Sequence, residues 1–123
     1  IEFYEQIKKH NLKIALATNA DDDAFLMAQK ALRLENFFGQ HMYNVSHVGT
    51  YKPDPSLYLY AADKIQIAPS ECIAIEDSAH GVQAAVAAGL YCIGINTSSN
   101  PEQVKNAHKM VNRYQEINLA EFL

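Results

Sequence analysis

Several polar residues directly follow short apolar runs, and their side chains are of the kinds that bind metal ions and phosphate. Glu76 and Asp77 follow the apolar run over residues 72–75. Two adjacent carboxylates repel each other, and a hard cation such as Mg²⁺, which takes oxygen ligands from one or two carboxylates, offsets that repulsion. The pair is therefore a candidate Mg²⁺ site. The spacing leaves a second interpretation equally open, in which Asp77 and Ser78 cap a helix and Glu76 is solvated.

A lysine and a Thr-Asn-Ala sequence could supply positive charge and hydrogen-bond donors for an anion. Lys52 lies in a loop rich in glycine and proline, where an ammonium can neutralise phosphate as a point charge. Thr18, Asn19 and the backbone from Ala20 onward close another apolar run, and their hydroxyl, amide and N–H groups could hold anion oxygens. Each feature also has an ordinary interpretation, because loop lysines are mostly exposed and Thr-Asn sequences mostly form turns.

Short apolar runs alternate with amphipathic stretches along the chain, and this alternation positions the polar residues. The apolar runs predict strands over residues 13–18 (buried on both faces), 42–48, 72–75, 91–95 and near 110–111. The amphipathic stretches predict helices over residues 2–11, after the capping run Asp21–Asp23, after an Asp54 cap with Pro55 in the first turn, from a Ser78 cap to Gly89, over 100–107, and at the C-terminus.

Strands that alternate with helices of about 10–14 residues predict repeated βαβ units. The predicted fold is therefore of the α/β class, with a parallel sheet covered by helices on both faces. In such sheets ligands bind outside the carboxyl ends of the strands. Thr18, Lys52 and the Glu76-Asp77 pair all follow predicted strands, so we expect them to meet at that edge.

Length and composition describe one domain of ordinary size. The chain has 123 residues, of which 49% are hydrophobic and 20% charged, and this excludes a disordered chain. The net charge of −4 suits neither nucleic acid nor an anionic membrane, and we expect neither as a partner. No apolar run approaches the ~20 residues of a membrane span, and the first residues do not form a signal peptide. Cys72 and Cys92 are widely spaced, which favours two buried, reduced thiols in the cytoplasm over a zinc site or a disulfide.

Three stretches, taken together and in order, resemble motifs of the haloacid dehalogenase-like (HAD) superfamily. They are Ala-Leu-Ala-Thr-Asn over residues 15–19, Gly-Thr-Tyr-Lys-Pro-Asp-Pro-Ser over residues 49–56, and Glu-Asp-Ser-Ala-His-Gly-Val with the alanine-rich sequence that follows, over residues 76–89. The resemblance is closest to the branch that contains beta-phosphoglucomutase and phosphoglycolate phosphatase. It covers nearly the whole chain.

The resemblance implies a Rossmann-like HAD core and a Mg²⁺-dependent phosphatase or phosphomutase that acts on a small phosphorylated metabolite. Thr18, with Asn19 and Ala20, would hold the transferring phosphoryl oxygens. Lys52 would bridge the phosphoryl group and the carboxylate of the nucleophile. Glu76 and Asp77 would hold Mg²⁺. A dehalogenase fits less well, because a carboxylate pair suits a metal that dehalogenation does not require.

The sequence departs from the family's pattern in its first motif, an Asp-x-Asp sequence that supplies the nucleophile and the general acid/base. The region before Thr18 contains no aspartate, and the run Asp21–Asp23 follows a different strand. The family's cap domain has no counterpart here either. Residues 1–123 are therefore expected to form a partial HAD-like core domain, the C-terminal portion of a longer protein.

The strand that carries the first motif lies, in this family, between the strand ending at Thr18 and the strand ending near Asp77. Without it, two strand edges face each other unpaired. We therefore expect completion by another segment or by self-association, a rearrangement of the strands, or marginal stability. The alternative to an enzyme part is a non-catalytic module that keeps the scaffold and a weak Mg²⁺ and phosphate site.

Overall fold

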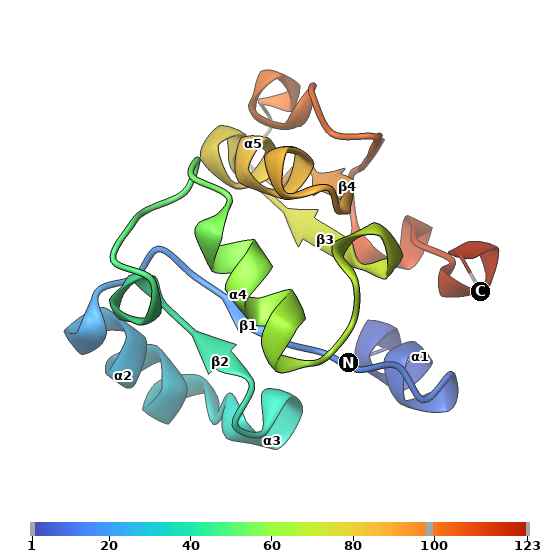
Figure 1. Ribbon diagram of the computed structural model, residues 1–123. Helices are drawn as coiled ribbons and strands as arrows, with labels where there is room; N and C mark the ends of the chain where they lie inside the picture. The colour runs from blue at the N-terminus through green and yellow to red at the C-terminus, as the bar shows by residue number, and fades with distance from the viewer. Residues whose placement is uncertain (1, 98–99, 123) are drawn as a thin grey trace.

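The computed structural model describes residues 2–97 and 100–122, and its helices and strands alternate as predicted (Figure 1). The helices and strands are α1 (Glu2–Lys9), β1 (Leu16–Ala17), α2 (Asp22–Leu32), α3 (Glu35–Phe38), β2 (Met42–Tyr43), α4 (Ser56–Lys64), β3 (Ile73–Glu76), α5 (Ala79–Ala88), β4 (Tyr91–Ile95) and β5 (Lys109–Val111). Short 3-10 helices are η1 (Val45–His47), η2 (Pro69–Glu71), η3 (Pro101–Val104), η4 (Tyr114–Glu116) and η5 (Leu119–Phe122).

The strand pairs that the structure describes are all parallel, which confirms the α/β class. Strand β1 pairs with β2, and Leu16 lies opposite Met42. A second sheet has the order β3–β4–β5, and Ile73 lies opposite Tyr91 at its start. Among the described strands, the division between the two sheets falls between β1 and β3, at the place where we expected a strand to be absent.

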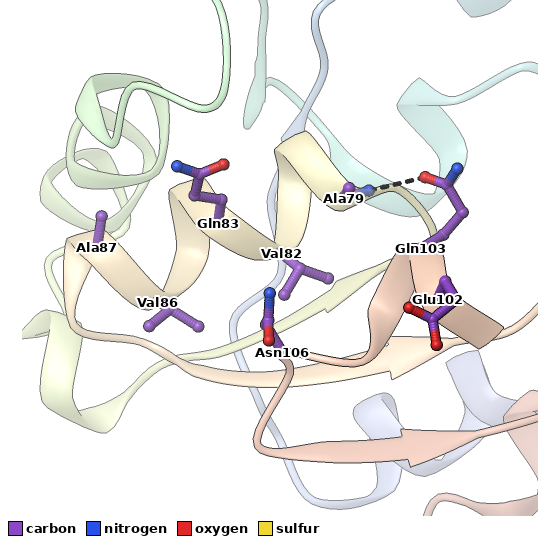
Figure 2. Close-up of a pocket in the computed structure, with 8 residues that line it drawn as sticks. All are labelled: Ala79, Val82, Gln83, Val86, Ala87, Glu102, Gln103 and Asn106. Carbon is purple, nitrogen blue, oxygen red and sulfur yellow. Dashed lines mark hydrogen bonds between the residues drawn. The ribbon is translucent and has the colours of Figure 1, made fainter.

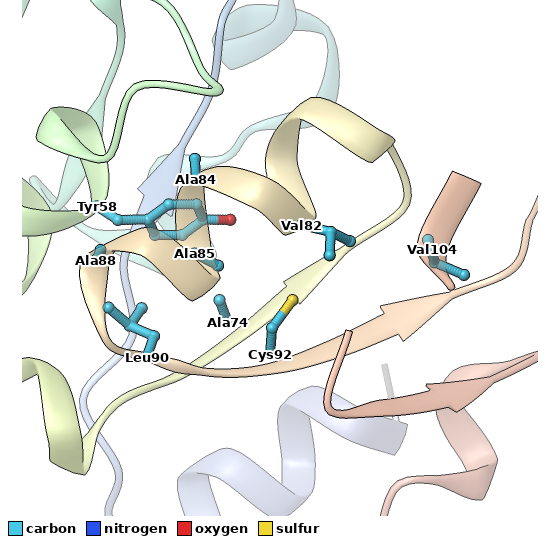
Figure 3. Close-up of a cluster of buried hydrophobic side chains, with 9 residues drawn as sticks. All are labelled: Tyr58, Ala74, Val82, Ala84, Ala85, Ala88, Leu90, Cys92 and Val104. Atoms are coloured by element: carbon cyan, nitrogen blue, oxygen red, sulfur yellow. The ribbon is translucent and has the colours of Figure 1, made fainter. Parts of the chain in front are cut away.

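Helices cover both faces of the β3–β4–β5 sheet (Figure 1). On one face, the alanine-rich side of α5 packs on Ala74 and Cys92, and Figure 3 shows the small side chains that allow the close approach. On the other face, Phe3 and Ile7 of α1 pack with Ile93 and its neighbours. Because side chains alternate along a strand, β3 and β4 each contribute to both clusters, whereas β5 contributes Val111 to the second cluster alone. Burying apolar area on both faces makes this sheet the core of the chain.

The bounds of α5 follow from its end residues, as predicted. The Ser78 hydroxyl accepts a hydrogen bond from the backbone N–H of Gly81 at 3.1 Å, which satisfies one of the free donors at the helix start. At the other end Gly89 has φ +89°, a left-handed conformation that glycine adopts without steric cost. Asp21 caps α2 in the same way, through a 2.8 Å bond from Ala24 N–H.

Several predicted elements are shorter than expected or are replaced. The strand over residues 13–18 is reduced to Leu16–Ala17, and it is only half-buried because it has a strand neighbour on one side. The strand over 42–48 ends at Tyr43, since Asn44 and His47 hydrogen-bond the local backbone and start η1. The predicted helices over 100–107 and at the C-terminus are short 3-10 helices, which rarely extend beyond 3–4 residues, and η3 and η5 bury Val104 and Leu119 respectively.

Two further differences concern helix starts. Asp54 is not the cap of α4: the residue at that position is Pro55, and the Asp54 carboxylate accepts instead from the N–H of Ser56, the first residue of the helix, at 2.8 Å. Helix α3 was not expected, and its Phe37 packs edge-on against Tyr4 of α1 with ring centroids 4.9 Å apart. This contact between distant segments is not visible in local periodicity.

Both cysteines are free; Cys92 is buried as predicted, whereas Cys72 is only half-buried. Burial raises the pKa of the Cys92 thiol to about 12, and burial also raises the pKa of Cys72. No described helix combines the length and the hydropathy that are needed to cross a bilayer.

Candidate active site at the strand ends

The ammonium of Lys52 lies between the carboxyl ends of β1 and β3. Its Nζ atom donates to the backbone carbonyl of Ala17 at 2.9 Å and to Oε2 of Glu76 at 2.7 Å. Lys52 is only 8% exposed, so this loop lysine is buried rather than solvated. The single side chain connects the two sheets where their strands end.

Glu76 is also buried, which contradicts the interpretation that it is solvated. It is the last residue of β3, and alternation along the strand places it on the same face as Ala74, toward α4 and α5. Its Oε2 atom accepts hydrogen bonds from both Lys52 and the hydroxyl of Tyr58. A buried carboxylate requires such partners, because losing water without replacing its hydrogen bonds is expensive.

Gly81 gives the Glu76 carboxylate its space. It lies in the first turn of α5, and a Cβ atom placed on it would overlap the carboxylate group of Glu76. A side chain of any size at position 81 would therefore displace Glu76. The absence of a side chain at this point, rather than backbone freedom, is what the site needs.

The Thr18–Ala20 segment lies beside Lys52, as predicted. The amide of Asn19 pairs with both backbone groups of Lys52: Oδ1 accepts from Lys52 N–H at 2.9 Å and Nδ2 donates to Lys52 C=O at 3.3 Å. The hydroxyl of Thr18 accepts from Ala20 N–H at 3.2 Å. The structure thus uses the Asn19 side chain to hold the lysine loop against the end of β1, while the role of the segment in binding phosphate stays a prediction.

Asn44 is a site-supporting residue that the sequence did not reveal, because it was assigned to the interior of a strand. It is only 1% exposed, and its Nδ2 atom donates to Ala20 C=O at 3.2 Å and to Asp22 Oδ1 at 2.9 Å. These bonds tie the loop after β1 to the end of β2. An asparagine directly after an apolar run is a turn-forming signal that could have identified it.

The hydrogen bonds around Asp22 make a pH-dependent prediction. Donation from Asn44 and from the Ser46 hydroxyl lowers the pKa of the Asp22 carboxyl from its usual 3.8. Because the folded state favours the ionised carboxylate, this contribution to stability is present above the unfolded pKa and is lost as the pH falls through the folded value. In Ser46→Ala we expect the pKa of Asp22 to rise toward 3.8, measured by NMR titration of the carboxyl carbon.

Asp54 is the matched control for this titration. It is exposed like Asp22, and hydrogen bonds from Ser56 lower its pKa. The Ser46→Ala substitution should leave the pKa of Asp54 unchanged. Equal pKa values of Asp22 in the parent chain and in Ser46→Ala would show that the bond from Ser46 does not form in solution.

Asp77 is exposed beside the buried Glu76, at the carboxyl end of β3. The cap of α5 is Ser78 alone, so the Asp77 carboxylate is not used as the helix cap. Within residues 2–97 and 100–122, no group of three or more His, Cys, Asp or Glu side chains could hold a metal ion. The shared role of Glu76 and Asp77 as metal ligands therefore stays a prediction based on two carboxylates.

A separate hollow of about 310 Å³ lies on the other side of α5, between this helix and the segment around η3 (Figure 2). Its rim is fixed by a 3.2 Å bond from Ala79 N–H to the side-chain oxygen of Gln103. The lining residues carry amide and aliphatic side chains and one carboxylate, that of Glu102, and they include neither Lys52 nor Glu76. The hollow is therefore distinct from the charged cluster at the strand ends.

Comparisons with known proteins agree on one family. A family model described as haloacid dehalogenase-like hydrolase matches residues 1–89. A phosphorylated carbohydrates phosphatase from Thermotoga maritima is 34% identical over 89 residues, which are 72% of this chain and 41% of that protein. The beta-phosphoglucomutase of Bacillus subtilis is 30% identical over 90 residues, which are 73% of this chain and 38% of that enzyme.

A solved structure shows the same arrangement. The crystal structure of a HAD hydrolase of family IA, variant 3, from Entamoeba histolytica superposes with a TM-score of 0.88 at 27% identity, and the match covers 98% of this chain and 56% of that chain. The chain thus spans about half of that structure and less than half of the two curated relatives.

Proposed function

The chain belongs to the haloacid dehalogenase-like hydrolase family, and from this premise we propose that its residues form part of a Mg²⁺-dependent phosphoryl-transfer site for a small phosphorylated metabolite. The names of two relatives, a phosphorylated carbohydrates phosphatase and a beta-phosphoglucomutase, support this class of substrate. Phosphatase and phosphomutase activities both fit the proposal.

The observation that carries the proposal is the buried Lys52 ammonium at the junction of two parallel strand ends. Ligands of parallel sheets bind at this edge, and Lys52 lies there within 2.9 Å of Ala17 C=O and 2.7 Å of Glu76. Phosphoryl transfer depends mainly on positioning and on neutralising charge. Lys52 supplies a positive charge, and its hydrogen bonds to Ala17 and Glu76 fix the position of that charge.

The residues around Lys52 have separable roles in this proposal. Lys52 places a positive charge beside the phosphoryl oxygens and the nucleophile. Thr18 and the backbone N–H groups that follow it orient those oxygens, in the manner of an anion site at the start of a helix. Asn19 keeps the lysine loop in place through its two bonds to the Lys52 backbone.

Glu76 and Asp77 carry the hard oxygen donors that Mg²⁺ prefers, and two carboxylates suffice because this ion retains several waters and also binds substrate phosphate. We assign the larger part in metal binding to the exposed Asp77, because one oxygen of Glu76 already accepts from Lys52 and Tyr58. When bound, Mg²⁺ would supply Lewis-acid neutralisation of the phosphoryl oxygens.

We propose that residues 1–123 are a partial core domain and that a segment carrying an aspartate nucleophile completes it beside β1 and β3. The division of the strands into two sheets at this point supports the proposal. A small phosphorylated metabolite is the proposed partner, and self-association through the same strand edges is the alternative route to completion. Two free thiols suit a reducing compartment such as the cytoplasm.

Metal binding by the 123-residue chain tests the proposed site. We expect added MgCl₂ to shift the backbone amide signals of residues 76–79 in NMR spectra, because Asp77 is exposed and lies next to a second carboxylate. Asp77→Asn should abolish these shifts, whereas Asp63→Asn, which removes an exposed carboxylate from α4, should leave them intact. Shifts that are absent, or that persist in Asp77→Asn, would remove Asp77 from the metal site.

The same chain should release no phosphate from para-nitrophenyl phosphate above background, since it contains no Asp-x-Asp sequence before Thr18. Substantial turnover that disappears in Asp77→Asn would show that a nucleophile lies within these 123 residues. Mg²⁺ binding without turnover agrees both with an incomplete enzyme and with a non-catalytic module. Activity that appears once a segment with an aspartate nucleophile is supplied favours the enzyme.

A further inference from the structure

Tyr58 is a residue of the charged cluster to which neither the motifs nor the family match assigns a role. It is the third residue of α4, and its ring is buried against the small side chains Ala84, Ala85 and Ala88 of α5 (Figure 3). Packing alone would account for a ring at this position. It does not account for a hydroxyl group, because a phenylalanine ring would fill the same space.

The hydroxyl of Tyr58 donates to Oε2 of Glu76, the same oxygen that accepts from Lys52. The Lys52 ammonium also lies 5.1 Å from the centre of the Tyr58 ring, within the range of a cation–π interaction. Tyr58 therefore contacts both charged residues, one through its hydroxyl and the other through its ring. It does so as a neutral group, without altering the charge balance of the cluster.

Three neighbours confine the Glu76 carboxylate. Lys52 and Tyr58 hold one oxygen, and the bare backbone of Gly81 lies against the carboxylate from the first turn of α5. Of these, Lys52 is the one whose ammonium must face a phosphate in the proposed function. When it does, Glu76 stays buried and still needs a donor, because an unpartnered buried carboxylate is strongly unfavourable.

We propose that Tyr58 is a positioning residue that holds the Glu76 carboxylate in place while Lys52 engages a phosphate group. This inference rests on the proposed function. Because the Tyr58 hydroxyl also donates to Glu76, the Lys52 ammonium can turn part of its hydrogen bonding to the substrate phosphate without leaving Glu76 unpartnered. Burial and the neighbouring Glu76 raise the pKa of Tyr58, so the hydroxyl remains a donor at neutral pH.

The first test uses the 123-residue chain without ligand and compares Tyr58→Phe with Tyr60→Phe. The Phe ring keeps the packing on α5 and the contact with Lys52, and only the bond to Glu76 is lost. We expect Tyr58→Phe to shift the Glu76 carboxyl-carbon signal and the Lys52 ammonium signal in NMR spectra. Tyr60 lies on the same helix but packs with Tyr43 and His47, so Tyr60→Phe should shift neither signal.

The second test adds inorganic phosphate in the presence of MgCl₂. In the parent chain the Lys52 ammonium signal should respond and the Glu76 signal should move little, whereas in Tyr58→Phe both should move. The dissociation constant of phosphate should rise by about ten- to hundredfold in Tyr58→Phe, as is typical when a group that orients a site residue is removed. A Tyr58→Leu variant, which also loses the ring, should bind no better than Tyr58→Phe.

The outcomes separate this inference from the proposed function. Unchanged Glu76 and Lys52 signals in ligand-free Tyr58→Phe overturn the role of Tyr58, regardless of the result of the phosphate titration. Equal phosphate affinity in the parent chain and in Tyr58→Phe also overturns it, and would leave Tyr58 as a packing residue. If the parent chain binds no phosphate while the ligand-free signals shift as expected, the proposed function fails and the role assigned to Tyr58 in phosphate binding fails with it, although its bond to Glu76 stands.

Discussion

Replacing Lys52 with methionine is expected to lower the free energy of unfolding by about 3–5 kcal/mol, because the substitution leaves a buried carboxylate without its cation. Both side chains of the Lys52–Glu76 pair are less than one-tenth exposed. Methionine retains most of the length and volume of lysine, so the loss reports charge and hydrogen bonds rather than a cavity. Urea denaturation followed by circular dichroism measures the change.

Two further variants make the Lys52 result specific. Lys105→Met removes a cation from the pair with Glu102, whose side chains are 60% and 72% exposed, and exposed pairs contribute about 0–1 kcal/mol. The double variant Lys52→Met/Glu76→Gln removes both buried charges and should recover a large part of the loss. A loss in Lys52→Met no larger than that in Lys105→Met would mean that water reaches the Lys52–Glu76 pair.

Gly81→Ala is expected to destabilise the chain by about 1–3 kcal/mol, the range for forcing extra atoms into a filled space. The sign is the informative part, because exchanging glycine for alanine inside a helix usually stabilises it by about 0.5–1 kcal/mol. Here the new methyl group would overlap the Glu76 carboxylate. The same denaturation measurement applies, and the amide signals of residues 76–79 should shift as well.

A double-mutant cycle with Glu76 tests the cause. In a Glu76→Ala background the carboxylate is gone, so the added methyl group at position 81 should stabilise α5 or have no effect. Ala87→Gly, at an exposed position of the same helix, should destabilise by about 1 kcal/mol and so report ordinary helix propensity. If Gly81→Ala is equally unfavourable with and without the Glu76 carboxylate, the close contact has another origin.

The sequence predicted those parts of the fold that depend on local signals. Helix α5 has the expected Ser78 cap and Gly89 end, and the alternation of strands and helices correctly indicated a parallel arrangement. The rule that ligands meet the carboxyl ends of strands brought Lys52 and Glu76 together without any knowledge of their contact. These predictions held because capping and periodicity are properties of neighbouring residues.

The parts that could not be predicted depend on contacts between distant residues. Tyr58 belongs to the amphipathic stretch that follows Pro55, and nothing near it in the chain indicates that its hydroxyl meets a carboxylate 18 residues away. Asn44 was assigned to the strand predicted over residues 42–48. Its actual bonds reach Ala20 and Asp22, more than 20 positions away, and no local pattern indicates them. The burial of Lys52 likewise depends on where β1 and β3 end, whereas a loop lysine is exposed in most proteins.

The separation of the cluster's contacts along the chain has a consequence for how it forms. The bonds of Lys52 to Ala17 and Glu76 and of Tyr58 to Glu76 join residues 35, 24 and 18 positions apart. Contacts of this range require loops to close, and the entropy cost of closing a loop comes before the contact contributes any stabilisation. A buried ion pair also cannot form until the apolar layers around it have excluded water. We therefore expect the cluster to assemble after the β3–β4–β5 core, late in folding. Its contacts should then affect the rate of unfolding more than the rate of folding.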